Sequence, residues 1–318
     1  MPLSSVSSRP QHSSLSDSPK KGYAGRKIQL APPTGFSDFF IGFGVHACRK
    51  YLFLDTNKRV VVYLTVVLIG SLIGEHLPLP RNWYFAQKHN IFNQWFVKLA
   101  WAWTCGLTGA LIYFTSHVYA CGDPRNMRQQ CARLVVGTGV WYLITSLIVH
   151  VERRTGLCVL KNQSAALQTD CVSAGGRWLP GFDISGHCFL LLYCLLLIQE
   201  ETKVFRNWDR LRRLLDSSEE NPVELRLLTS SEIDMARKSH EENTPKIRLL
   251  VIALAMLHGI WELMLLMTVL YYHTMPHKLV GAGVGVLCWL ITYRMWYRTA
   301  FSPGMPGHCK IRYISSKR

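Results

Sequence analysis

The fold is decided by the stretch Gly181-Phe-Asp-Ile-Ser-Gly-His-Cys-Phe-Leu-Leu-Leu-Tyr-Cys-Leu-Leu-Leu-Ile198, in which a polar start passes without a linker into an apolar run. Asp183 is placed to cap a helix, and Gly186 keeps bulk away from its first turn. His187 then lies where free backbone N–H groups and the positive end of the helix dipole favour an anion such as phosphate. The alternative is an ordinary interfacial histidine at headgroup level.

Six apolar runs are long enough, or nearly so, for the roughly 20 residues that a helix needs to cross a bilayer. Hydrophobic residues make up 49% of the 318 residues, and they are gathered in these runs. The sequence therefore predicts an all-α integral membrane protein with six transmembrane helices, at about Val60 to Gly74, Phe96 to Thr115, Leu134 to Val149, Ile184 to Ile198, Ile247 to Leu270 and Leu279 to Trp296.

The basic residues predict the orientation of these helices, because Lys and Arg are retained in cytosolic loops. Of the 36 Lys and Arg residues, 28 fall before the first helix, in alternate loops, or after the last helix. Both termini are therefore expected in the cytosol. The net charge of +16 is a consequence of this topology and of contact with anionic membrane lipids, so nucleic-acid binding has little support.

We divide the chain into three parts. Residues 1–35 are expected to be a disordered cytosolic tail without the apolar core of a signal peptide. Residues 36–304 form the six-helix transmembrane domain, with a lumenal loop at 151–182 and a cytosolic loop at 199–246. Residues 305–318 are a cytosolic tail. Phe36 to Phe53 is apolar but interrupted by charges, which favours a segment lying on the membrane.

The cytosolic loop contains a predicted amphipathic helix from Lys203 to Leu215. Its apolar side suits a headgroup layer, although a solvated helix with a protein partner remains open. The acidic stretch from Asp216 to Thr244 lacks periodicity and is expected to be flexible.

The lumenal loop contains Cys158 and Cys171, with the glycosylation sequon Asn162-Gln-Ser164 between them. Because charge independently places this loop outside the cytosol, where disulfides persist, we expect a Cys158–Cys171 bridge and glycosylation of Asn162.

A second histidine reaches the level of His187. The fifth apolar run ends in Tyr272-His273 on the lumenal side, and Lys98 lies about one turn inside the second predicted helix on that same side. The alternative, in which the Lys98 side chain snorkels to headgroup level, explains a lysine at this position equally well. Two histidines and a lysine in one layer nevertheless indicate a phosphate-sized site.

Several blocks in the right order resemble one family, the fat storage-inducing transmembrane (FIT) proteins. They are Gly181 to Leu191, Phe96-Val-Lys-Leu-Ala-Trp-Ala-Trp-Thr104, Leu134-Val-Val-Gly-Thr-Gly-Val-Trp141, Tyr272-His273, Lys278-Leu-Val-Gly281 and Phe301-Ser-Pro-Gly304. The resemblance covers roughly Lys50 to Gly304. It implies an endoplasmic-reticulum protein, related to the lipid phosphatase and phosphotransferase superfamily, that cleaves the diphosphate of fatty acyl-CoA on the lumenal side and supports lipid droplet formation.

The resemblance also implies roles for residues. Ile184-Ser-Gly-His187 looks like the superfamily's Pro-Ser-Gly-His element, so Ser185 and Gly186 would bind substrate and His187 would protonate the departing phosphate oxygen. His273 would be the nucleophile that forms a phosphohistidine. The segment Phe189-Leu190-Leu191 resembles the family element associated with neutral lipid, which implies diacylglycerol or triacylglycerol as partners.

This sequence departs from the superfamily in lacking its phosphate-clamping arginines. We expect Lys98 to supply part of that charge, with Arg81, Lys88 or Lys278 as further candidates. A serine hydrolase is poorly supported, because no Gly-x-Ser-x-Gly elbow occurs. No metal or other cofactor is expected, since no carboxylate cluster accompanies the histidines. The alternative function is a non-catalytic membrane protein that partitions neutral lipid into droplets; any cytosolic protein partner is unknown.

Overall fold

The computed structural model describes residues 36–80, 82–87, 89–159, 168–216 and 228–311. Most of these residues are helical. The elements in chain order are α1 (Phe36–Leu52), α2 (Thr56–His76), η1 (Tyr84–Ala86), η2 (Phe92–Val97), α3 (Ala100–Tyr119), α4 (Pro124–Thr155), β1 (Leu157–Val159), α5 (Gln168–Ser173), β2 (Arg177–Leu179), α6 (Gly186–Thr202), η3 (Lys203–Asn207), α7 (Trp208–Asp216), α8 (Ser230–Tyr271), α9 (Met275–Trp289), η4 (Leu290–Met295) and η5 (Trp296–Arg298).

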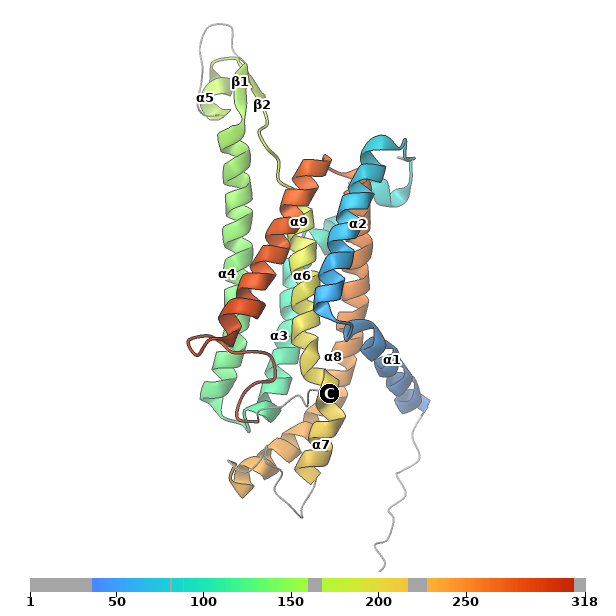
Figure 1. Ribbon diagram of the computed structural model, residues 1–318, viewed down its shortest axis with the longest axis vertical. Coiled ribbons are helices and arrows are strands. Elements are labelled where there is room, and N and C mark those ends of the chain that lie inside the picture. Colours follow the sequence, from blue (N-terminus) through green and yellow to red (C-terminus); the bar gives the residue numbers. More distant parts are fainter. Residues whose placement is uncertain (1–35, 81, 88, 160–167, 217–227, 312–318) are drawn as a thin grey trace, which may run out of the picture.

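The long helices form one bundle (Figure 1). Helices α2, α4 and α8 run in one direction along it, and α3, α6 and α9 return in the other. Each predicted apolar run overlaps one helix of this set, although the runs predicted from Phe96, from Ile184 and to Trp296 extend beyond α3, α6 and α9. Four helices in the described part of the chain are long and apolar enough to cross a membrane, namely α2, α4, α8 and the helix that begins with α9. The chain is therefore a multi-pass membrane protein.

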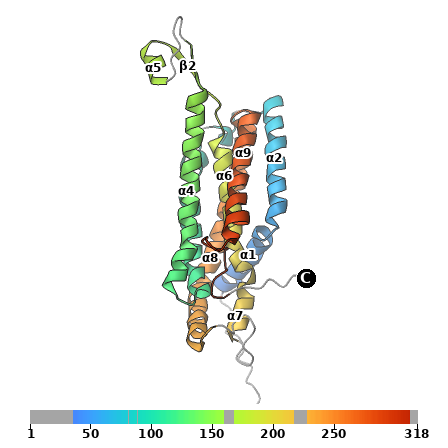
Figure 2. The ribbon, with the colours of Figure 1, turned by 60° about the vertical axis from the view of Figure 1, so that its left-hand side comes forward.

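Helix α6 is the centre of the bundle, between α9, α3 and α8 (Figures 1 and 2). Every residue from Leu191 to Thr202 is buried. The glycines of α9 permit its close approach to α6: a Cβ at Gly281 would lie 2.4 Å from the carbonyl oxygen of Ser185, and one at Gly285 would lie 2.9 Å from that of Phe189. Gly281 and Gly285 therefore serve close packing of α9 on α6.

Ion pairs join the helices in the interior. Arg133 of α4 donates from Nε to Glu201 of α6 at 2.8 Å, and Tyr293 donates to the same carboxylate at 2.7 Å. Arg59 of α2 donates from Nη1 to Glu262 of α8 at 3.1 Å. A buried charge that loses its partner costs several kcal/mol, so these pairs fix the register of α2, α4, α6 and α8.

Helix α7 corrects one prediction. Its apolar side faces the protein and not a headgroup layer: Trp208 is fully buried, stacks on His240 of α8 at 4.5 Å between ring centroids and donates to Thr244 Oγ1 at 3.0 Å. The expected flexibility of residues 216–244 is also wrong for residues 230–244, because α8 begins at Ser230 behind a capping box of Thr229 and Glu232. The sequence did not predict this part of α8 because the side that packs against α7 is polar and includes the buried residues Ser239, His240 and Asn243.

The predicted interfacial segment Phe36 to Phe53 forms α1, which lies oblique to the bundle (Figure 1). Its last turn is anchored: Leu52 is fully buried, and the Tyr51 hydroxyl lies 2.8 Å from Nδ1 of His258 on α8. Residues 1–35, predicted to be a disordered tail, lie outside the described residues.

Candidate active site

The first turn of α6 is held against the start of α9. Ser185 is the N-cap, and its Oγ accepts a hydrogen bond from the Cys188 N–H at 3.3 Å. The Ser185 N–H donates to the carbonyl of His277 at 3.1 Å. The prediction that Asp183 caps α6 is therefore wrong, because Ser185 performs that role and leaves the Asp183 carboxylate free for another partner.

That partner is His273. Its Nδ1 lies 3.0 Å from Oδ2 of Asp183, across the gap between the loop before α6 and the α8–α9 link. The backbone of His273 has a φ of 55°, a left-handed conformation that few non-glycine residues adopt. Such conformations persist where the surroundings impose them, and they gather at functional sites. The neighbouring Tyr272 hydroxyl donates to the carbonyl of Ala86 at 3.2 Å and secures the link.

His187 completes the cluster from the second position of α6. Its ring is within electrostatic range of His273, Asp183 and Lys98. The other side chains predicted at this membrane level, His273 and Lys98, therefore lie within electrostatic range of His187, and the three come from three parts of the chain. The sequence did not predict Asp183 as the partner of His273, although its place four residues before His187 was a signal that a carboxylate lies near that histidine.

Among the described residues, Lys98 is a cation within electrostatic range of His187. It is the C-cap residue of η2, and its exposed amine donates to Gln94 Oε1 at 2.6 Å. Lys278 points elsewhere, since its amine is buried and donates to the carbonyl of Val269 at 2.7 Å. Arg81 and Lys88 lie outside the described residues.

The predicted lipid-binding residues mostly face the interior. Phe189 is fully buried and stacks on Tyr193 at 6.0 Å between centroids, and Leu191 is fully buried as well. Leu190 is only partly buried. Gly186 has open space where a Cβ would stand, so its small size is not required by the packing of the described residues.

A cavity of about 560 Å³ opens beside His273. The end of α2 supplies one wall with Glu75, His76 and the segment Leu77 to Leu79, and the end of α8 supplies the other with Tyr271. This cavity adjoins the histidine cluster and is large enough for part of a cofactor-sized substrate.

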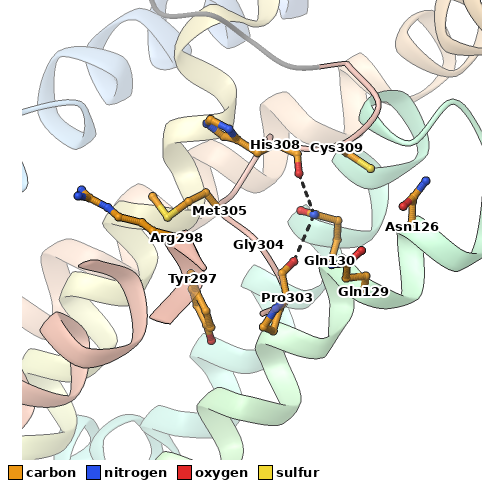
Figure 3. A pocket seen from close by; sticks show the side chains of 10 residues that line it. All are labelled: Asn126, Gln129, Gln130, Tyr297, Arg298, Pro303, Gly304, Met305, His308 and Cys309. Carbon is orange, nitrogen blue, oxygen red and sulfur yellow. Dashed lines mark hydrogen bonds between the residues drawn. The ribbon is translucent and has the colours of Figure 1, made fainter. Parts of the chain in front are cut away.

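A cavity of similar size, about 590 Å³, lies at the opposite end of the bundle (Figure 3). It is lined by α4 and the segment after η5, which Gln130 joins through hydrogen bonds from Nε2 to the carbonyls of Pro303 and His308. No predicted site residue is among the described residues that line it.

The loop that leads into the site carries a disulfide between Cys158 and Cys171. It ties the β1–β2 hairpin to α5 at the end of α4, beyond the rest of the bundle (Figures 1 and 2). From there β2 leads to Phe182, whose N–H donates to Thr155 Oγ1 at 2.7 Å. The sequon residue Asn162 lies outside the described residues.

Fold and cluster together define a multi-pass helical membrane protein with a paired-histidine site at one end of its bundle. Residues 81–293 match the family described as fat storage-inducing transmembrane protein, FIT. The chain belongs to this family.

Curated relatives agree with that assignment. The chain is 34% identical over 295 residues to the acyl-coenzyme A diphosphatase FITM2 of Drosophila melanogaster, an alignment that covers 89% of this chain and 68% of the relative. It is 31% identical to the protein of that name from Caenorhabditis elegans, over 85% of this chain and 90% of the relative. It is 38% identical to the protein of that name from Homo sapiens, over 76% of this chain and 82% of the relative. No solved structure gives a significant match.

Proposed function

We propose that this chain is an acyl-CoA diphosphatase, and the observation that carries the proposal is the His273–Asp183 pair with His187 beside it. The relatives named for this activity cover most of the chain at 31% to 38% identity. The substrate contains a diphosphate, and the cluster offers a nucleophile, an acid and a cation in one place.

The proposed reaction depends on which ring nitrogen of His273 has a lone pair available for attack. The Asp183 carboxylate, 3.0 Å from Nδ1 of His273, favours the tautomer that carries its proton on Nδ1, and the lone pair on Nε2 is then available to attack phosphorus. The bridging P–O bond breaks, its electrons stay on the departing oxygen, and His187 supplies a proton to that oxygen. Water then attacks the phosphohistidine, His187 takes the proton from this water, and the P–N electrons return to Nε2. Asp183 stabilises the positive imidazole in the intermediate.

Several finer features belong to this proposal. Helices α3 and α6 cross the membrane together with the four apolar helices, which gives six spans and two cytosolic termini. The histidine cluster faces the lumen of the endoplasmic reticulum, and the enzyme supports lipid droplet formation and fat storage. Diacylglycerol or triacylglycerol contacts α6 at Leu190, and the basic cytosolic end meets anionic lipids. The alternation of basic loops and the antiparallel order of the helices support this topology.

Purified protein with a long-chain acyl-CoA tests the activity. We expect His273→Ala to abolish turnover and His187→Ala to lower it about 10²- to 10⁴-fold, because general acid catalysis is lost. A substrate with a better leaving group should restore part of the rate only in His187→Ala. His150→Ala, an exposed position on α4, is the control and should retain the wild-type rate.

The rival function is a lipid-partitioning protein without catalysis. It predicts full droplet formation in cells that carry His187→Ala and His273→Ala together, with no diphosphatase activity in the wild type. That pair of results would reject the enzyme.

A further inference from the structure

The charges around the two histidines differ from side to side. His187 lies within electrostatic range of Lys98, a cation whose amine is exposed, and of Asp183, whose carboxylate lies 3.0 Å from Nδ1 of His273. His273 borders the cavity that contains Glu75, and no Lys or Arg is among the described residues that line this cavity. The buried Lys278 lies within electrostatic range of Glu75, but its amine donates to the Val269 carbonyl. Lys278 does not line the cavity, whereas Glu75 does.

The two halves of acyl-CoA differ in the same way. On one side of the diphosphate is the adenosine half, which carries an additional 3′-phosphate and leaves as 3′,5′-ADP. On the other side is the acyl-pantetheine arm, which is uncharged and carries amides and a hydroxyl. A carboxylate repels a phosphate and accepts hydrogen bonds from amides and hydroxyls, whereas a lysine attracts the phosphate.

The surroundings of the cavity also suit an acyl chain. Its walls include Leu77 to Leu79 and Leu270. Beside it, α2 and α8 expose large apolar side chains, including Ile73, Leu77 and Leu266. A chain that leaves the cavity along the exposed sides of α2 and α8 therefore enters an apolar environment.

We propose that acyl-CoA binds with its acyl-pantetheine arm in the cavity of Glu75 and His273 and its adenosine half beside His187 and Lys98. This orientation rests on the proposed function. It fixes the bond chemistry: His273 attacks the phosphorus that carries pantetheine, a P–N bond forms there, and the bridging oxygen leaves on 3′,5′-ADP with the proton from His187. Water then releases acyl 4′-phosphopantetheine from His273.

Hydrolysis in H₂¹⁸O tests the orientation, because the oxygen from water enters the fragment whose phosphorus was attacked. We expect mass spectrometry to find one ¹⁸O in acyl 4′-phosphopantetheine and none in 3′,5′-ADP. Label in 3′,5′-ADP, alone or in both fragments, would overturn the orientation. Absence of any hydrolysis would instead refute the proposed function itself.

Product inhibition provides a second readout with matched variants. We expect Lys98→Ala to raise the inhibition constant of 3′,5′-ADP about tenfold, because one charge-assisted contact to phosphate is lost. Lys98→Arg should restore it. Glu75→Ala should leave it within about twofold, or lower it, while raising the KM for acyl-CoA. An inhibition constant that rises with Glu75→Ala and not with Lys98→Ala would place the adenosine half in the cavity and contradict the proposal.

Discussion

Asp183 shows how one side chain gives its neighbour a chemical role. Its carboxylate lies 3.0 Å from Nδ1 of His273 because Ser185 satisfies the helix end in its place. A neutral imidazole can place its proton on either nitrogen, and a carboxylate at Nδ1 selects the tautomer with a free Nε2. In the proposed mechanism Asp183 therefore acts as a positioning residue for the nucleophile and never touches the phosphorus.

The first prediction concerns Asp183→Asn. An amide keeps the size but cannot stabilise the positive imidazole, and its N–H₂ group favours the wrong tautomer. We expect kcat to fall about 10²- to 10⁴-fold, by analogy with other histidines oriented by a carboxylate, with KM changed little. The matched control is Asp170→Asn on α5, an exposed position outside the cluster, which should retain full activity. Equal rates for the two variants would show that the pair has no catalytic role.

At the scale of single residues, the sequence predicted the two histidines and Lys98 because polar residues at helix ends share a membrane level. It could not predict the partner of Asp183, since His273 stands 90 residues further along the chain and its left-handed backbone depends on the α8–α9 link. It also gave no reason to select Glu75, which acquires its place in the cavity only through the packing of α2 on α8.

At the scale of helices, the contact between α6 and α9 sets the positions of both histidines. Gly281 allows the backbones to meet at Ser185, directly before the turn that bears His187. Gly283, two residues along the same helix, faces open space, and a Cβ added there would have no neighbouring atom within 4 Å. The two glycines therefore provide a comparison of close approach with helix propensity alone.

The second prediction is that Gly281→Ala destabilises the protein by about 1 to 3 kcal/mol, because the new Cβ forces α9 away from α6. A displacement near 1 Å at a catalytic group can cost about 10²-fold in rate, so we expect kcat to fall with stability. Gly283→Ala should change stability by less than about 1 kcal/mol. Thermal unfolding in detergent and turnover of acyl-CoA measure both effects. Indistinguishable melting temperatures for the two variants would contradict the packing described for Gly281.

Helix α7 illustrates why an amphipathic pattern does not identify the surface that it covers. The residues Val204, Trp208, Leu211 and Leu215 are all buried, as a single apolar side predicts. Hydrophobicity alone cannot distinguish a lipid surface from a neighbouring helix, and here the neighbour is the first part of α8. Hydropathy does not reveal this neighbour, because the buried residues of that part of α8 include the polar Ser239, His240 and Asn243.

The third prediction is that Trp208→Ala lowers the free energy of unfolding by about 3 to 5 kcal/mol, the usual cost of removing a large aromatic side chain from a core. Arg213→Ala, exposed on the same helix, should change it by about 0.5 kcal/mol or less. Thermal unfolding of the purified variants gives the comparison. If Arg213→Ala is the more damaging change, α7 is held by its charges and not by the packing of Trp208 on α8.

At the scale of the whole molecule, hydropathy predicted the location of the six long helices of the bundle. A segment that crosses a membrane must be apolar and must form its backbone hydrogen bonds within itself, so a long apolar run indicates a helix. The relation between helices was not available from periodicity. Helix α6 is buried on all sides and α4 on one side only, yet both read as plain apolar runs. Only the structure explains why α6 can be so uniformly apolar from Phe189 to Ile198: the other helices surround it.

The last prediction concerns the sides of the membrane. Residues 160–167 and 217–227 are separated by α5, β2, α6 and α7, so a protease site inserted in each will lie on opposite sides only if α6 crosses the bilayer. In sealed microsomes we expect cleavage at 217–227 and at both terminal tags, with protection at 160–167. Asn162→Gln should remove a glycan that Gln163→Ala retains, since only the first change destroys the sequon. Cleavage at both inserted sites would leave α6 outside the set of spanning helices, and the histidine cluster could then not be lumenal.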